Sequence, residues 1–240
     1  MWRMKDRLII ALDLSDEDRL NQVLKDLRGS IDWVKVGMEI FYRFGPAIVQ
    51  RIKDHGYRIF LDLKMHDIPN TVERAARNLT RLGVDMFNVH TAGGAAMMGR
   101  AAVAARETAA ELGLTPPIVI GVTVLTSISP AIWQNEVKGA LPLPDQVMHF
   151  SALAKNAGLA GVVCSPEEII DVKNRCGQDF LTVVPGIRPT WAETGDQKRI
   201  TTPKQAILNG ADYLVIGRPV LAAPDPKAAV ARILEEIKEG

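Results

Sequence analysis

Eight short apolar runs, rich in β-branched residues, recur along this chain of 240 residues and limit the folds that it can adopt. Each run is continuously apolar rather than alternating, as expected for strands that are covered on both faces. Such strands occur in parallel sheets that carry helices. The runs are Leu8–Leu12, Trp33–Gly37, Ile59–Leu63, Met86–Val89, Ile118–Leu125, Gly161–Cys164, Phe180–Val184 and Tyr213–Ile216.

Segments with apolar residues at helical spacing separate these runs. Several begin with proline, whose missing N–H is tolerated in the first helical turn. Several stop at a glycine, as left-handed helix caps do, and Ser15 is a candidate cap at the start of the first segment. The predicted helices are Asp16–Leu27, Pro46–His55, Pro69–Leu82, Ala95–Leu112, Asp145–Ala157, Pro166–Arg175, Pro203–Leu208 and Pro226–Lys238.

Eight strand–helix units favour a closed (β/α)₈ barrel, a TIM barrel, in which one domain spans residues 1–240. The alternative is an open doubly wound sheet. That fold calls for a glycine-rich turn after the first strand, whereas residues 11–15 here read Ala-Leu-Asp-Leu-Ser. The barrel is therefore the preferred interpretation.

The composition is that of an ordinary globular protein. The 29 basic and 28 acidic residues nearly cancel, which argues against a nucleic-acid surface or a polybasic membrane patch. Cys164 and Cys176 fit neither a disulfide framework nor a zinc motif. No apolar stretch approaches the ~20 residues that span a bilayer, and the first seven residues lack a signal-peptide core. We expect a cytoplasmic protein.

Charged residues occur inside or directly after each of the first three predicted strands. Asp13 follows the first, Lys35 lies within the second, and Asp62 and Lys64 lie two residues apart in and after the third. Residues two apart on a strand share a face, so these four side chains can converge inside a barrel. Buried charges are costly unless they pair or serve chemistry. An inert ion network is the alternative, but apolar residues replace such networks at little loss of stability.

Three further polar residues near strand ends are ambiguous. Asp67 precedes Ile68 and a proline, so it could serve a site or simply cap the next helix. His66 could be a core residue rather than a catalyst. His90 ends the fourth strand and could line a pocket, although a structural role is the stronger hypothesis for it.

The ends of the last two strands are typical of a phosphate site, since barrels frequently bind phosphate there. Arg188 follows the seventh strand, and Gly217 and Arg218 follow the eighth. A glycine lets a backbone N–H approach an anion closely, and arginine donates a two-pronged hydrogen bond to phosphate. A plain turn is the alternative. The segment of residues 188–199 is long and polar for a loop between a strand and the following helix. Loops of this kind are often lids over an active site.

Together these residues resemble the orotidine 5′-phosphate decarboxylase family. The most specific part is the segment from Phe60 to Thr71, Phe-Leu-Asp-Leu-Lys-Met-His-Asp-Ile-Pro-Asn-Thr, which contains that family's Asp-x-Lys-x-x-Asp signature. Other matching blocks follow in order along almost the whole chain: Asp13, Lys35, residues 122–127, residues 185–189, residues 195–197 and residues 216–219.

The resemblance implies the decarboxylation of orotidine 5′-monophosphate to uridine 5′-monophosphate, without cofactor or metal. It also implies a homodimer in which Asp67, Ile68 and Thr71 reach into the partner's site. The implied catalytic residues are Lys64, Asp62, Asp67 and Lys35. The implied substrate-binding residues are Asp13, Lys35, Ile68, Thr71, Thr126, Ser127, Pro185, Arg188, Gln197, Gly217 and Arg218.

Two other functions remain open at this point. One is another phosphate-binding barrel enzyme, such as a sugar-phosphate decarboxylase, an aldolase-like synthase or an epimerase. Metal-dependent relatives of that kind place an acidic ligand on the second strand, where this chain has Lys35. The other is a non-catalytic phosphate-binding barrel, which has no need of the Asp62, Lys64 and Asp67 cluster.

Overall fold

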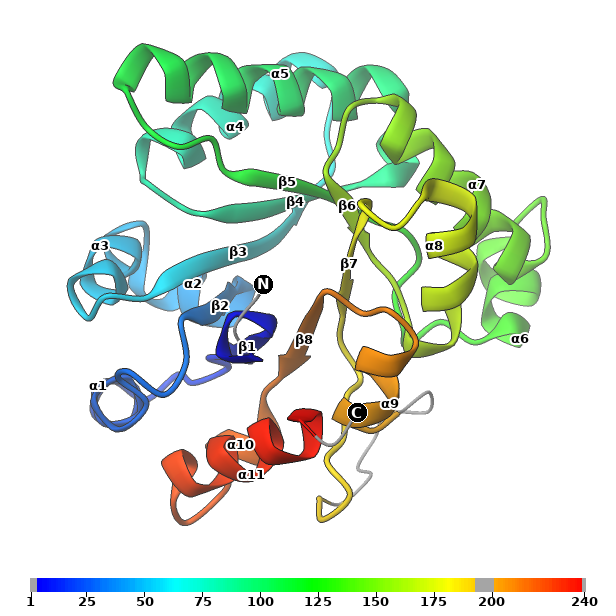
Figure 1. Ribbon diagram of the computed structural model, residues 1–240. Helices are drawn as coiled ribbons and strands as arrows, with labels where there is room; N and C mark the ends of the chain where they lie inside the picture. The colour runs from blue at the N-terminus through cyan, green and yellow to red at the C-terminus, as the bar shows by residue number, and fades with distance from the viewer. Residues whose placement is uncertain (1–3, 193–200, 239–240) are drawn as a thin grey trace.

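The computed structural model describes residues 4–192 and 201–238, and within them eight parallel strands close into a barrel in chain order. Helices lie around the outside of the strands (Figure 1). The predicted (β/α)₈ fold is therefore confirmed. The strands are β1 Leu8–Ala11, β2 Trp33–Gly37, β3 Arg58–Met65, β4 Met86–His90, β5 Ile118–Val122, β6 Gly161–Val163, β7 Leu181–Val184 and β8 Tyr213–Ile216.

All eight predicted helices are present, within a few residues of their predicted ends. Three short ones, α2, α6 and α10, were not predicted, because three to seven residues are too few to display a helical period. The α-helices are α1 Glu17–Asp26, α2 Met38–Phe44, α3 Ala47–Asp54, α4 Pro69–Arg81, α5 Gly94–Leu112, α6 Pro130–Ile132, α7 Leu143–Asn156, α8 Ile169–Cys176, α9 Pro203–Leu208, α10 Arg218–Leu221 and α11 Pro226–Lys238.

Two local predictions were wrong. The cap of α1 is Asp16 rather than Ser15, since the Asp16 side chain accepts a hydrogen bond from the backbone N–H of Arg19. The fifth strand ends at Val122 and not at Leu125. The backbone leaves the sheet there, while the hydroxyl of Thr123 donates to the carbonyl of Val163 at 3.0 Å. This early exit brings the following residues to the rim of the barrel.

An apolar layer fills the N-terminal half of the barrel interior. It takes one large side chain from each of seven strands, and the rings of Trp33 and Tyr213 meet edge to face at 5.6 Å between centroids. The positions two residues further along the same strands face the same interior, and three of them are polar: Lys35, Asp62 and Asn88. The layer is built from Ile9, Trp33, Phe60, Met86, Ile120, Val183 and Tyr213.

Ion pairs also tie together the N-terminal ends of the strands, away from the polar rim. Asp85 precedes β4 and Asp212 precedes β8, four units later in the barrel. Each carboxylate accepts from a backbone N–H of the preceding strand at 2.7 Å and from a lysine ammonium at 2.6 Å; these partners are Ile59 with Lys53, and Thr182 with Lys173. Because the scaffold itself supplies all these partners, we assign both carboxylates and their lysines a structural role.

Candidate functional site

Four charged side chains meet at the C-terminal ends of β1, β2 and β3, where barrel enzymes place their chemistry. The ammonium of Lys35 lies 3.1 Å from Asp13 Oδ1 and 3.5 Å from Asp62 Oδ2. The ammonium of Lys64 lies 2.7 Å from Asp62 Oδ1. The structure therefore brings together the four residues that the sequence places at these strand ends, with acidic and basic groups alternating.

Asp62 is the central group of this array. Burial by itself would raise the pKa of its carboxyl group, but the nearby ammonium groups of Lys35 and Lys64, and hydrogen bonds from Lys64 and Asn88, outweigh that effect. The pKa of Asp62 consequently lies below its ordinary value of 3.8. At neutral pH this carboxylate is ionised and holds an ammonium on each side.

A pocket of about 210 Å³ opens directly above the apolar layer. Lys35, Asp62 and Lys64 form its charged wall. Thr126, Ser127 and Pro185, from the segments after β5 and β7, line it too; the family resemblance implies all three as substrate-binding residues. The remaining wall is apolar and was not predicted; it consists of Phe60, Val122, Val124, Leu125, Val163, Val183 and Val215. A flat, partly polar ring fits such a pocket.

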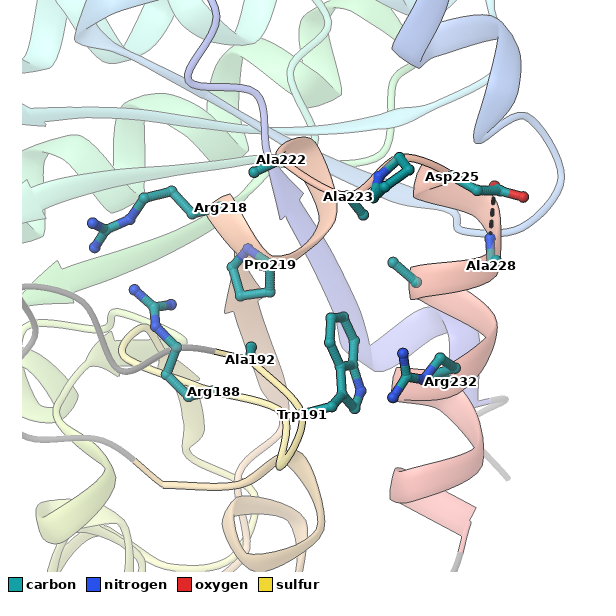
Figure 2. A pocket seen from close by; sticks show the side chains of 12 residues that line it. Arg188, Trp191, Ala192, Arg218, Pro219, Ala222, Ala223, Asp225, Ala228 and Arg232 are labelled. Atoms are coloured by element: carbon teal, nitrogen blue, oxygen red, sulfur yellow. Dashed lines mark hydrogen bonds between the residues drawn. The ribbon is translucent and has the colours of Figure 1, made fainter.

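A second, larger cavity of about 660 Å³ lies beside the ends of β7 and β8. Arg188 and Arg218 both line it, and Figure 2 shows their guanidinium groups pointing to the same side, one from the segment after β7 and one from the start of α10. Arg218 begins α10, so the segment is a helix start rather than the plain turn that the sequence left open. Two neighbouring guanidinium groups suit a dianionic ligand such as phosphate.

Gly217 and Gly37 let the backbone come close to the charge array. A Cβ on Gly217 would lie 3.7 Å from Asp13 Oδ2, so the start of α10 is next to the ion cluster. A Cβ on Gly37 would lie only 2.8 Å from the Lys35 ammonium. Gly37 was not singled out from the sequence, although its place two residues after Lys35 on the same strand face was a usable signal.

Asp67, Ile68 and Thr71 do not join this pocket within the single chain. All three are exposed, and Ile68 has 65% of its surface accessible. The Asp67 carboxylate accepts from the N–H of Ile68 at 2.6 Å. The helix cap is Ile68 and not Asp67, and no side-chain hydrogen bond closes that end of α4. The capping alternative for Asp67 was therefore wrong.

The two histidines lie beside the array. The rings of His66 and His90 pack at 5.4 Å between centroids, with His90 half-buried. Burial, together with His66 and Lys64, lowers the pKa of His90 below its usual value of 6.5. Neither ring lines the two pockets, which fits the structural role expected for His90. Gln197 lies outside the described residues.

In the part of the chain that the structure describes, no group of three or more His, Cys, Asp or Glu side chains is arranged to hold a metal ion. None of the helices found there combines the length and the apolar character needed to cross a membrane. Both cysteines are free thiols in the interior.

Comparison with known proteins gives a consistent result. The model of the orotidine 5′-phosphate decarboxylase / HUMPS family matches residues 6–233. The orotidine 5′-phosphate decarboxylase of Moorella thermoacetica is 49% identical over 98% of this chain and 93% of its own length. That of Syntrophotalea carbinolica is also 49% identical, over 97% and 95%. The crystal structure of orotidine 5′-phosphate decarboxylase from Lactobacillus acidophilus superposes with a TM-score of 0.86 at 41% identity, covering 97% of this chain and 99% of that one.

The low pKa of Asp62 predicts a specific acid sensitivity. A carboxylate whose folded pKa is depressed contributes stability that is present above its unfolded pKa and is lost as the pH falls through the folded one. We expect the free energy of unfolding of the wild type to fall more steeply below about pH 4 than that of Asp62→Asn. Urea titrations of both proteins from pH 3 to 7 measure this. If the free energies of unfolding of the two proteins fell in parallel below about pH 4, Asp62 would have no depressed pKa.

Proposed function

This chain belongs to the orotidine 5′-phosphate decarboxylase family, and we propose that it converts orotidine 5′-monophosphate to uridine 5′-monophosphate and CO₂ with Lys64 as the central catalytic group. This reaction is the last step of de novo UMP synthesis and makes the chain a carboxy-lyase. The observation that carries the proposal for Lys64 is its ammonium, held 2.7 Å from a buried carboxylate at the wall of the pocket.

The chemistry explains why an ammonium is needed at this place. Breaking the bond between C6 and the carboxylate releases CO₂ and leaves the electron pair in a ring orbital outside the π system. A positive charge fixed beside C6 stabilises that pair, and the effect is greatest in a preorganised site with little water. Lys64 then gives one N–H proton to C6, and the neutral amine regains a proton from solvent. The product carries hydrogen where the carboxylate was.

Asp62 has two roles in this proposal. It keeps Lys64 charged and aimed, and its own negative charge stands next to the carboxylate of the substrate, which disfavours the bound substrate relative to the transition state. Lys35 and Asp13 complete the array and hydrogen-bond the ribose hydroxyls. Thr126 and Ser127 meet the polar edge of the pyrimidine, and Pro185 packs against the ring.

The 5′-phosphate occupies the arginine-lined side of the site. Arg188 and Arg218 bind its oxygens, and the backbone N–H of Gly217 donates to it. Binding energy gathered there, away from the reacting bond, can raise the rate when it closes a loop over the substrate and excludes water. By resemblance to the family, Gln197 connects the phosphate with the base.

We further propose a homodimer in which Asp67, Ile68 and Thr71 complete the partner's site. The exposure of all three residues, and of the large apolar side chain of Ile68 in particular, supports this. Asp67 would then stand on the other side of the partner's Lys64 ammonium from Asp62. We place this enzyme, as one catalytic domain over residues 1–240, in the cytoplasm, in keeping with its biosynthetic reaction.

Replacing Lys64 tests the central role. We expect purified wild-type protein in excess chelator to remove the ultraviolet absorbance of orotidine 5′-monophosphate, and Lys64→Ala to show no measurable turnover with an unchanged circular dichroism spectrum. Lys25→Ala, on the exposed face of α1, is the matched control and should keep wild-type activity. Substantial activity in Lys64→Ala would remove that ammonium from the mechanism, and loss of activity in chelator would reveal a metal.

Replacing Arg218 tests the phosphate site. Arg218→Ala should lower kcat/KM for the nucleotide by the equivalent of about 2–5 kcal/mol, the range for truncating one partner of a close charge pair. Orotidine, which lacks the phosphate, is the internal control, and the variant should process it as slowly as the wild type does. An equal loss on both substrates would indicate a general defect instead of a lost phosphate contact.

Mixing two inactive variants tests the shared site. Lys64→Ala and Asp67→Asn homodimers should each be inactive, because every site lacks one group. After the subunits are mixed and allowed to exchange, about a quarter of the sites should combine an intact Lys64 with the partner's intact Asp67. Recovered activity near that fraction supports the arrangement. No recovery, despite demonstrated exchange of subunits, would place Asp67 in the site of its own chain.

A further inference from the structure

Asn88 is a buried amide in the middle of the apolar strand β4, and no role has been assigned to it so far. Only 1% of its surface is accessible. A buried side-chain amide is costly unless its donors and acceptors find partners. The partners of Asn88 therefore show what this residue is for.

Both ends of the Asn88 amide bond to the catalytic segment of β3. Its oxygen accepts from the backbone N–H of Lys64 at 2.8 Å, and its nitrogen donates to Asp62 Oδ1 at 2.7 Å. The same Asp62 oxygen accepts from the Lys64 ammonium. One amide thus fixes the backbone of the lysine and the carboxylate that aims its side chain.

The backbone at Lys64 needs such support. Its φ is +51°, a left-handed conformation that is strained for a residue with a side chain. The pairing of β3 with β4 is irregular here, since Leu61 pairs with Phe87 and Met65 pairs with Val89. Asn88 is the single residue between those two partners, and it stands opposite three residues of β3. Its side chain supplies the hydrogen bond that regular strand pairing would otherwise give to Lys64.

The donor end of Asn88 also acts on the charge of Asp62. Its hydrogen bond is one of the interactions that lower the pKa of that carboxyl group, beside those of Lys35 and Lys64. A neutral donor at this place stabilises the carboxylate without adding a charge that would compete with Lys64. An amide meets both needs, because it accepts from one group and donates to the other.

We propose that Asn88 is a positioning residue of the decarboxylation site, which holds the Lys64 backbone in its left-handed conformation and the Asp62 carboxylate under the ammonium at the same time. The inference rests on the proposed role of Lys64. Asn88 has no contact with the substrate in this proposal, so its loss affects the rate of the chemical step and leaves binding through the phosphate intact.

Two variants separate positioning from stability. Asn88→Ala removes both hydrogen bonds, and we expect kcat to fall by about 10- to 100-fold, the scale of a misplaced catalytic group, while KM and the Kd for uridine 5′-monophosphate change less than about threefold. Thr182→Val is the matched control. It deletes a buried hydroxyl that bonds Asp212 at the N-terminal end of the barrel, so it should lower Tm without changing kcat.

The isosteric variant Asn88→Asp provides a readout that a purely structural role would not move. Its oxygen still accepts from the Lys64 N–H, but an ionised carboxylate then faces Asp62, and two such groups tend to share one proton. A protonated Asp at this position restores the donor. Relative to the wild type, kcat of Asn88→Asp should therefore recover as the pH is lowered from 8 to 6, whereas the deficit of Asn88→Ala should stay constant.

The inference is overturned if folded Asn88→Ala keeps kcat within about threefold of the wild type, or if Asn88→Asp follows the wild-type pH profile at every pH. Should Asn88→Ala fail to fold, the pH profile of Asn88→Asp decides alone. Lys64→Ala, assayed in parallel, distinguishes a failure of the proposed mechanism from a failure of the positioning role of Asn88. If it is active, the mechanism itself is wrong; if it is inactive while both Asn88 variants behave as wild type, only the positioning role is wrong.

Discussion

The site depends on one buried carboxylate, Asp62, that is held between two ammonium groups. Taking a carboxylate out of water is unfavourable unless several donors replace the lost solvent. Asp62 has the ammonium groups of Lys35 and Lys64 and the amide of Asn88. Because these donors come from β2, β3 and β4, the array can form only after these three neighbouring strands have paired. The position of the Lys64 ammonium therefore depends on the pairing of all three strands.

The two ends of the barrel divide stability from chemistry. At the N-terminal end, Asp85 and Asp212 bond backbone N–H groups and lysines of the scaffold at short distances. Below the site, an apolar layer that includes Trp33 and Tyr213 excludes water from the interior. At the C-terminal end the backbone departs from regular pairing, and Lys64 adopts a left-handed conformation. The regular half of the structure supports the irregular half, where a charged group has to be aimed.

The fold also provides two separate pockets, and each of them suits a different part of the ligand. The smaller pocket combines charge with an apolar wall, as a pyrimidine bearing a carboxylate requires. The larger one presents Arg188 and Arg218, which suit a phosphate. Asp13, which pairs with Lys35 of the smaller pocket, lies close to Gly217, which precedes Arg218 of the larger one. Asp67, Ile68 and Thr71 lie exposed and line neither pocket.

The sequence by itself determined the eight strands, their helices and the polar residues at their ends, because apolar periodicity, prolines and glycines act locally. Resemblance to a family then supplied roles for Lys64 and its neighbours. Only the tertiary structure decided that the fifth strand ends at Val122, that Asp67 is not a helix cap, and that Asn88 binds both Asp62 and Lys64. The end of the fifth strand and the contacts of Asn88 arise from the pairing of one strand with another. A register shift between two strands leaves no mark in the local pattern of either.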